Sequence, residues 1–217
     1  MGNEITVQSL ISKDEREQLY KILYIGITAY NRLLDENRHL EASQFFSEIK
    51  TRILNFTIKR QFEEDMLVKD FPFKIDIKDV NAFKSKALFV ENSFTRIKIA
   101  STPKVNKFVT GSKIPKYMLR ESQKNSRYTK KIRLFILKNN DVEIREEKEV
   151  FMILGYGIKN RDIEHLNFMI PEEDMKSTID SFNAMNEYYE TVMVTENDDY
   201  TEKKIVALKN EAKKLIN

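Results

Sequence analysis

The first third of the chain carries apolar residues three or four positions apart, which is the repeat of an amphipathic helix. This spacing predicts a helix over about 13–34, and Ser12-Lys13-Asp14-Glu15 has the form of a capping box at its start. A second helical pattern runs from Ala42 to about Met66. After a break at 35–39 we expect the two helices to pack as an antiparallel pair.

From Phe71 onward the apolar repeat changes to every second residue, as in a β-strand. The first such segment, 71–78, contains Pro72 and predicts an edge strand, because proline cannot donate a hydrogen bond to a neighbouring strand. Short apolar runs predict further strands at 87–90, 94–99 and 132–137. The runs 150–157 and 166–170 flank a polar stretch, 159–162, and predict a hairpin.

The last quarter of the chain predicts two helices. Pro171 stands where the first residue of a helix belongs, and three acidic residues follow it, so we expect a helix over 171–190. Three methionines lie in this segment or just after it, and we expect them to fill gaps in the core: Met175, Met185 and Met193. A final helix at about 201–216 is expected to bury Ile205, Leu208, Ala212 and Leu215.

Helices followed by a sheet and then by helices predict the α+β class: an N-terminal helical pair, a central mostly antiparallel sheet and C-terminal helices. No internal repeat and no proline- or glycine-rich linker divides the chain. We therefore predict a single α+β domain over 1–217. It comprises a helical part at about 12–66, a sheet-containing part at about 70–195 and a C-terminal helix at about 201–216.

The amino-acid composition supports a folded core and excludes several classes of functional site. The 217 residues are 41% hydrophobic and 33% charged, which is enough apolar material for a core. With no cysteine, disulfides, thiolate zinc sites and cysteine nucleophiles are excluded, and two histidines leave little room for histidine chemistry. No apolar run approaches the roughly 18 residues that span a membrane, so we expect no membrane association and a cytoplasmic protein. Richness in lysine, asparagine and isoleucine is typical of AT-rich bacterial or phage genomes.

Charge is distributed unevenly along the chain. The formal net charge is +3, but residues 84–133 hold 14 basic residues and only two acidic ones, Glu91 and Glu121. With 34 acidic residues in 217, a stretch of this length would be expected to hold about eight. Residues 134–217 hold 11 basic and 18 acidic residues. The scarcity of carboxylates between 84 and 133 therefore predicts a basic surface.

This basic stretch predicts contacts with a polyanion. If 116–131 were helical, its cations would fall within an arc of about 120°; otherwise it is a basic arm that becomes ordered on its partner. Three aromatic residues in it, Phe108, Tyr117 and Tyr128, are candidates for stacking on unpaired bases. In the alternative interpretation the stretch neutralises the acidic C-terminal part of the same molecule. The candidate nucleic-acid-binding residues are Lys104, Lys107, Lys113, Lys116, Arg120, Lys124, Arg127, Lys130 and Lys131.

One short motif suggests catalysis. Asp76-Ile77-Lys78 resembles the D-x-K half of the PD-(D/E)XK nuclease signature. That resemblance implies a divalent cation held by paired carboxylates, with the lysine orienting a water molecule. It covers three residues, and the family's upstream Pro-Asp element is absent. Asp76 and Lys78 are thus the catalytic candidates, and we predict neither a cofactor nor a resident metal.

Other motifs are incomplete. Gly111-Ser112-Lys113 lacks the earlier glycine of a phosphate-binding loop, and Gly155-Tyr156-Gly157 lacks the third glycine of a dinucleotide site. We interpret Gly155 and Gly157 as a point of close packing or as a bend in a strand. His165, next to Glu164, is a candidate ligand or base, whereas His39 is expected at the surface.

Three functions follow from these patterns. The first is a nucleic-acid-associated accessory protein that binds phosphates of DNA or RNA without sequence preference. The second is an interaction or regulatory protein of phage or mobile-element type, whose basic segment meets an acidic protein partner. The third is a metal-dependent nuclease. The patterns favour a protein without enzymatic activity and do not predict an oligomeric state.

Overall fold

The computed structural model describes residues 5–81, 84–105, 107–108, 113–126, 149–196 and 198–216. Their contacts divide the chain into two compact units. The first, which we call the sheet unit, comprises Met1–Lys13, Pro72–Lys159 and Ile163–Met185. The second, the helical unit, comprises Asp14–Phe71, Asn160–Asp162 and Asn186–Asn217. That the chain forms a single domain stays a prediction.

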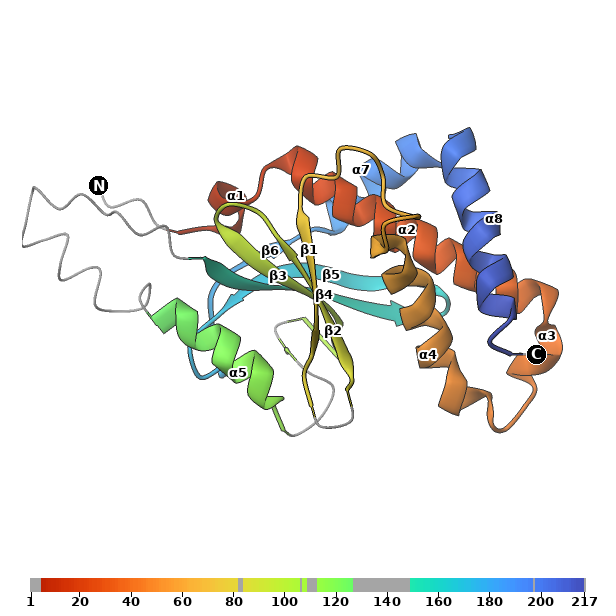
Figure 1. The fold of residues 1–217 in the computed structure, drawn as a ribbon, viewed down its shortest axis with the longest axis horizontal. Helices are drawn as coiled ribbons and strands as arrows, with labels where there is room; N and C mark the ends of the chain where they lie inside the picture. Colours follow the sequence, from red (N-terminus) through yellow and green to blue (C-terminus); the bar gives the residue numbers. More distant parts are fainter. Residues whose placement is uncertain are drawn as a thin grey trace, which may run out of the picture. The chain divides into compact units, whose positions relative to one another are not determined.

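The sheet unit contains a six-stranded sheet (Figure 1). Its strands follow one another in chain order. β1 and β6 form its edges, so the edge strand expected after Pro72 is confirmed. Antiparallel pairs join β1 to β2, β2 to β3 and β5 to β6, whereas β3 and β4 are parallel. With helices before and after this mostly antiparallel sheet, the α+β class is confirmed. The strands are β1 (Lys74–Asp79), β2 (Lys86–Glu91), β3 (Thr95–Ser101), β4 (Val150–Lys159), β5 (Asp162–Pro171) and β6 (Thr178–Asn183).

The parallel pairing of β3 and β4 requires a crossover connection, which contains helix α5 (Lys116–Ser122) and the 3-10 helix η2 (Gln123–Asn125). The buried Asn125 amide fixes this connection to the sheet. Its nitrogen donates to the carbonyls of Phe151 and Pro171, both at 2.8 Å, and its oxygen accepts from the Phe151 amide at 2.9 Å. Met118 of α5 packs in the same hydrophobic cluster as Phe151. The strand predicted at 132–137 lies outside the described residues.

The hairpin is confirmed, since β4 and β5 are adjacent strands joined through Asn160 and Arg161. The helix predicted at 171–190 is wrong in its first half. Residues 171–183 end β5, turn at Glu172–Ser177 through a 2.9 Å backbone hydrogen bond, and form β6. Ile179 and Phe182, three positions apart, suit a helix locally, but pairing of β6 with β5 provides hydrogen bonds that the local pattern does not reveal.

The helical unit contains most of α2 (Lys13–Glu36), followed by α3 (Arg38–Glu41), α4 (Phe46–Lys59), the 3-10 helix η1 (Arg60–Phe62), most of α7 (Met185–Thr195) and α8 (Asp199–Lys213). The first predicted helix is confirmed. The second, predicted from Ala42 to about Met66, corresponds to α4 and η1, whereas α3 lies before it and was not predicted. The buried Arg16 of α2 forms an ion pair with the half-buried Glu187 of α7 at 2.6 Å, and the Tyr20 hydroxyl donates to the same carboxylate at 2.9 Å. No helix in the described part of the chain is long and apolar enough to cross a membrane.

The C-terminal helix buries Ile205, Leu208 and Ala212 as expected, but Leu215 follows the end of α8 and is 57% exposed. The prediction that three methionines fill the core is also only partly correct. Met175 is buried and Met185 is half-buried, whereas Met193 of α7 is 74% exposed and does not fill the core.

At Gly26, helix α2 packs closely against Ile58 of α4. A Cβ atom there would lie 2.8 Å from Ile58 Cγ1 and 3.0 Å from Ile58 Cα. Because one of these atoms belongs to the backbone, a side chain at position 26 would push the helices apart.

We expect Gly26→Ala to lower the free energy of unfolding by about 1–3 kcal/mol, the cost of overpacking a close contact. Helix propensity alone would favour alanine by about 1 kcal/mol, so the sign of the effect distinguishes packing from propensity. Urea unfolding measures it. Ala207→Gly, at an exposed position of α8, calibrates the propensity term, and a stabilised Gly26→Ala protein would contradict the packing argument.

Candidate functional site

Arg96 of β3 is the centre of a charged cluster in the sheet unit. The strand register pairs Arg96 with Glu91 and Phe89 with Asp76, so these side chains project from one face of the sheet. Arg96 is 4% exposed; it contacts Asp76 Oδ2 at 2.5 Å, forms an ion pair with Glu91, and stacks 4.1 Å above the Phe89 ring. The carboxylate of Glu121, from α5, lies 3.2 Å from Arg96 Nε, but without hydrogen-bond geometry. One guanidinium thus holds three carboxylates.

Lys124 extends the cluster through η2. Its Nζ lies 2.7 Å from Glu121 Oε2 and 2.9 Å from Glu149 Oε2. Burial acts to lower the pKa of Lys124, but hydrogen bonds to the two carboxylates outweigh it and the pKa is raised. Lys124, a predicted phosphate contact, is therefore already paired within the molecule. Its contact with Glu149 fits the alternative in which the basic stretch neutralises acidic residues further along the chain.

Five other predicted cations remain at the surface of the crossover. All are exposed, and no carboxylate in the described parts of the chain lies within ion-pair distance of them. Lys116 and Arg120 are one turn apart on α5 and therefore project from the same side of the helix. We call these residues the crossover cations: Lys104, Lys107, Lys113, Lys116 and Arg120. The remaining three candidates, Arg127, Lys130 and Lys131, lie outside the described residues, as does Tyr128.

The two aromatic candidates that the structure describes, Phe108 and Tyr117, pack against the core of the sheet unit. Phe108 is buried in the hydrophobic cluster of the sheet unit. Tyr117 is half-buried and packs edge-to-face on Phe89, with ring centroids 6.3 Å apart. Stacking of these rings on bases would require them to leave those contacts.

Asp76 and Lys78, the catalytic candidates, lie together on β1. Lys78 Nζ contacts Asp76 Oδ2 at 2.8 Å, and Arg96 holds the same oxygen. Burial acts to raise the pKa of Asp76, but the hydrogen bonds from Lys78 and Arg96 prevail and hold its pKa below the usual value. Among the described residues no group of three acidic or histidine side chains is placed to hold a metal ion. The nuclease therefore stays a hypothesis based on its motif.

His165 has a packing role in this geometry. Its Nε2 lies 3.0 Å from the Thr102 hydroxyl, and the side chain is buried. A Cβ atom at Gly157 would lie 2.1 Å from His165 Cε1, so glycine leaves the space that the ring occupies. The interpretation of this glycine as a point of close packing is thereby confirmed. His39 lies at the surface, as expected.

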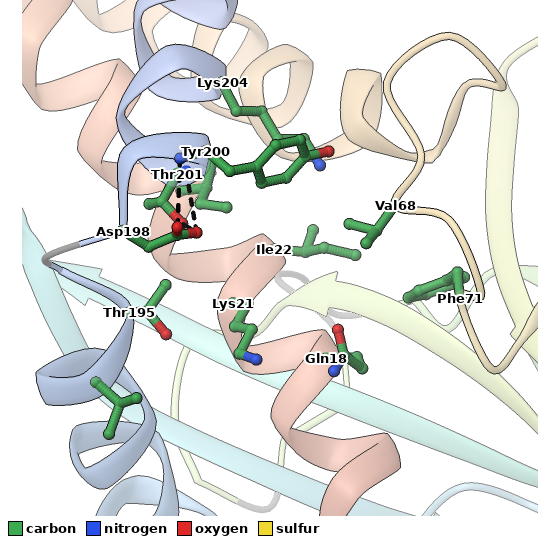
Figure 2. A pocket seen from close by; sticks show the side chains of 12 residues that line it. Gln18, Lys21, Ile22, Val68, Phe71, Thr195, Asp198, Tyr200, Thr201 and Lys204 are labelled. Carbon is green, nitrogen blue, oxygen red and sulfur yellow. Dashed lines mark hydrogen bonds between the residues drawn. The ribbon is translucent and has the colours of Figure 1, made fainter.

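Sequence reasoning missed a cavity of about 300 Å³ in the helical unit, between α2, α7, the start of α8 and the segment that leads to Phe71. Figure 2 shows Lys204 extending from α8 beside the Tyr200 ring, above Ile22 and Val68. The sequence contains a signal for this site. Lys204 stands one residue before Ile205 and four before Leu208, so it occupies a buried position of an amphipathic helix, where lysine is rare.

We expect Arg96→Met to lower the free energy of unfolding by about 3–5 kcal/mol at pH 7, because three partly buried carboxylates lose their shared counter-charge. Their protonation then favours the folded state, so the deficit should shrink as the pH falls from 7 towards 4. Chemical unfolding at both pH values measures it. Arg52→Met, at an exposed position, should change stability by no more than about 0.5 kcal/mol. Equal effects of the two substitutions would contradict a central role for Arg96.

Comparison with protein-family models, with curated proteins and with solved structures finds no match to this chain. No relative therefore supplies a function, and any function must be argued from the chain's own residues.

Proposed function

We propose that the sheet unit binds the phosphate backbone of nucleic acid through the crossover cations, without sequence preference. The observation that carries this proposal is an asymmetry of charge. The two carboxylates of residues 84–133, Glu91 and Glu121, are both held by Arg96, while the five crossover cations are exposed without a carboxylate partner in the described residues.

This asymmetry favours a polyanion for a physical reason. An exposed lysine paired with a carboxylate gives little net field, whereas five cations without an ion-pair partner among the described residues attract anions over roughly one Debye length, about 8 Å at physiological salt. Binding to DNA releases condensed counter-ions, so it depends steeply on salt. Phosphate contacts of this kind position a protein but carry no base information, which is why we propose binding without sequence preference.

For five phosphates neutralised on duplex DNA, the logarithm of the affinity should fall against the logarithm of salt concentration with a slope of about −4.5. We expect a variant with all five crossover cations changed to glutamate to lose most of this slope. Fluorescence anisotropy of a labelled DNA duplex between about 50 and 200 mM salt measures it.

The helical unit offers a control with the same change in net charge. It consists of glutamate substitutions at five exposed basic residues, namely Lys50, Arg52, Lys69, Lys203 and Lys214. This control should keep the slope of the parent. If both variants bind DNA as the parent does, or if both lose binding equally, the crossover cations are not the interface. Competition by poly-glutamate as effective as that by DNA would instead favour an acidic protein partner.

A further inference from the structure

The Lys204 ammonium is buried without a hydrogen-bonding partner. Lys204 is 6% exposed, and its Nζ has no hydrogen-bond acceptor within the described residues. The nearest favourable contact given by the structure is the face of the Tyr200 ring, with the centroid 5.9 Å away. Burying a cation is costly unless an anion or several acceptors compensate it. The described part of the chain therefore leaves this charge open to a ligand.

The other charged and titratable groups that line the cavity do not neutralise Lys204. Asp198, the only carboxylate among the lining residues, caps α8 and accepts hydrogen bonds from the Tyr200 and Thr201 amides, each at 3.3 Å (Figure 2). The Thr201 hydroxyl also donates a hydrogen bond to the Asp198 carboxylate, at 3.1 Å. Lys21 of α2 adds a second positive charge. α7 and the segment before Phe71 contribute only groups that do not titrate.

The remaining wall is mostly apolar. Ile22 and Ile25 of α2, Val68, Phe71 and Val194 of α7 surround the space. Such a wall favours a hydrocarbon group over a polar one. It also offers few hydrogen-bond donors to a second negative charge on the ligand. A ligand that matches the cavity thus carries one anionic group for the ammonium and an apolar body for the wall.

We propose that this cavity binds a small carboxylate with an apolar body, and that the Lys204 ammonium is its counter-ion. The site lies within the helical unit and is independent of the crossover cations. Burial lowers the pKa of Lys204 to about 8. Without a ligand, the Lys204 side chain is therefore mostly protonated at pH 7 and loses its proton over the next two pH units. A bound carboxylate stabilises the charged form and raises this pKa again.

The probe is octanoate, compared with 1-octanol, which has the same hydrocarbon chain and no charge. Isothermal titration calorimetry at pH 7 should give saturable octanoate binding that Lys204→Met weakens by about tenfold or more, the value of a charge-assisted hydrogen bond. Methionine keeps a chain of similar length, so octanol binding should change by less than about threefold. Lys21→Met is the matched control at the second lysine of the cavity, and it should weaken octanoate binding less than Lys204→Met does.

The pH dependence gives a second measurement. Octanoate affinity of the parent should fall as the pH rises from 7 to 9, while that of Lys204→Met should stay constant. Near pH 8 the parent should take up protons on binding, which is seen as a dependence of the heat on the ionisation enthalpy of the buffer. Absence of saturable octanoate binding would overturn the proposal. Equal binding of octanol, or a Lys204→Met protein with unchanged octanoate affinity and pH profile, would do so as well.

Discussion

The sheet unit depends on a single buried guanidinium. Arg96 collects carboxylates from β1, β2 and α5, and so links two neighbouring strands and the crossover helix to β3. Without this cation three carboxylates would stand close together at low dielectric, and their mutual repulsion would oppose the packing of α5 on the sheet. Glu91 and Glu121 are held by Arg96, and among the described residues the five exposed crossover cations have no carboxylate within ion-pair distance.

Two lysines illustrate how surroundings decide the chemistry of one side-chain type. Lys124 lies between Glu121 and Glu149, and these partners raise its pKa. Lys204 lies among apolar groups with no acceptor in the described residues, and burial lowers its pKa to about 8. The first is a structural cation already neutralised within the chain. The second carries an uncompensated charge, which is the physical basis for proposing a ligand.

Prediction from sequence succeeded for elements stabilised by interactions within a few residues, and failed where the stabilising partners lie far away in the chain. α2, the edge strand β1 and the hairpin of β4 and β5 were predictable, because hydrophobic periodicity and turn residues act within a few positions. The segment 171–183 was not, since its hydrogen bonds lie on β5 rather than within itself. Likewise the candidate list included Lys124 on charge alone, and it omitted Lys204, although a lysine at a buried helix position was visible in the pattern.

By itself the sequence determined the α+β class, the positions of most elements and the scarcity of acidic residues between 84 and 133. Only the tertiary structure decided which of the cations in that stretch are exposed, because ion pairing depends on distances between residues far apart in the chain. Arg96 meets Asp76 and Glu121 through strand register and through the packing of α5, neither of which leaves a local mark. Charge is a property of the sequence, whereas its compensation is a property of the fold.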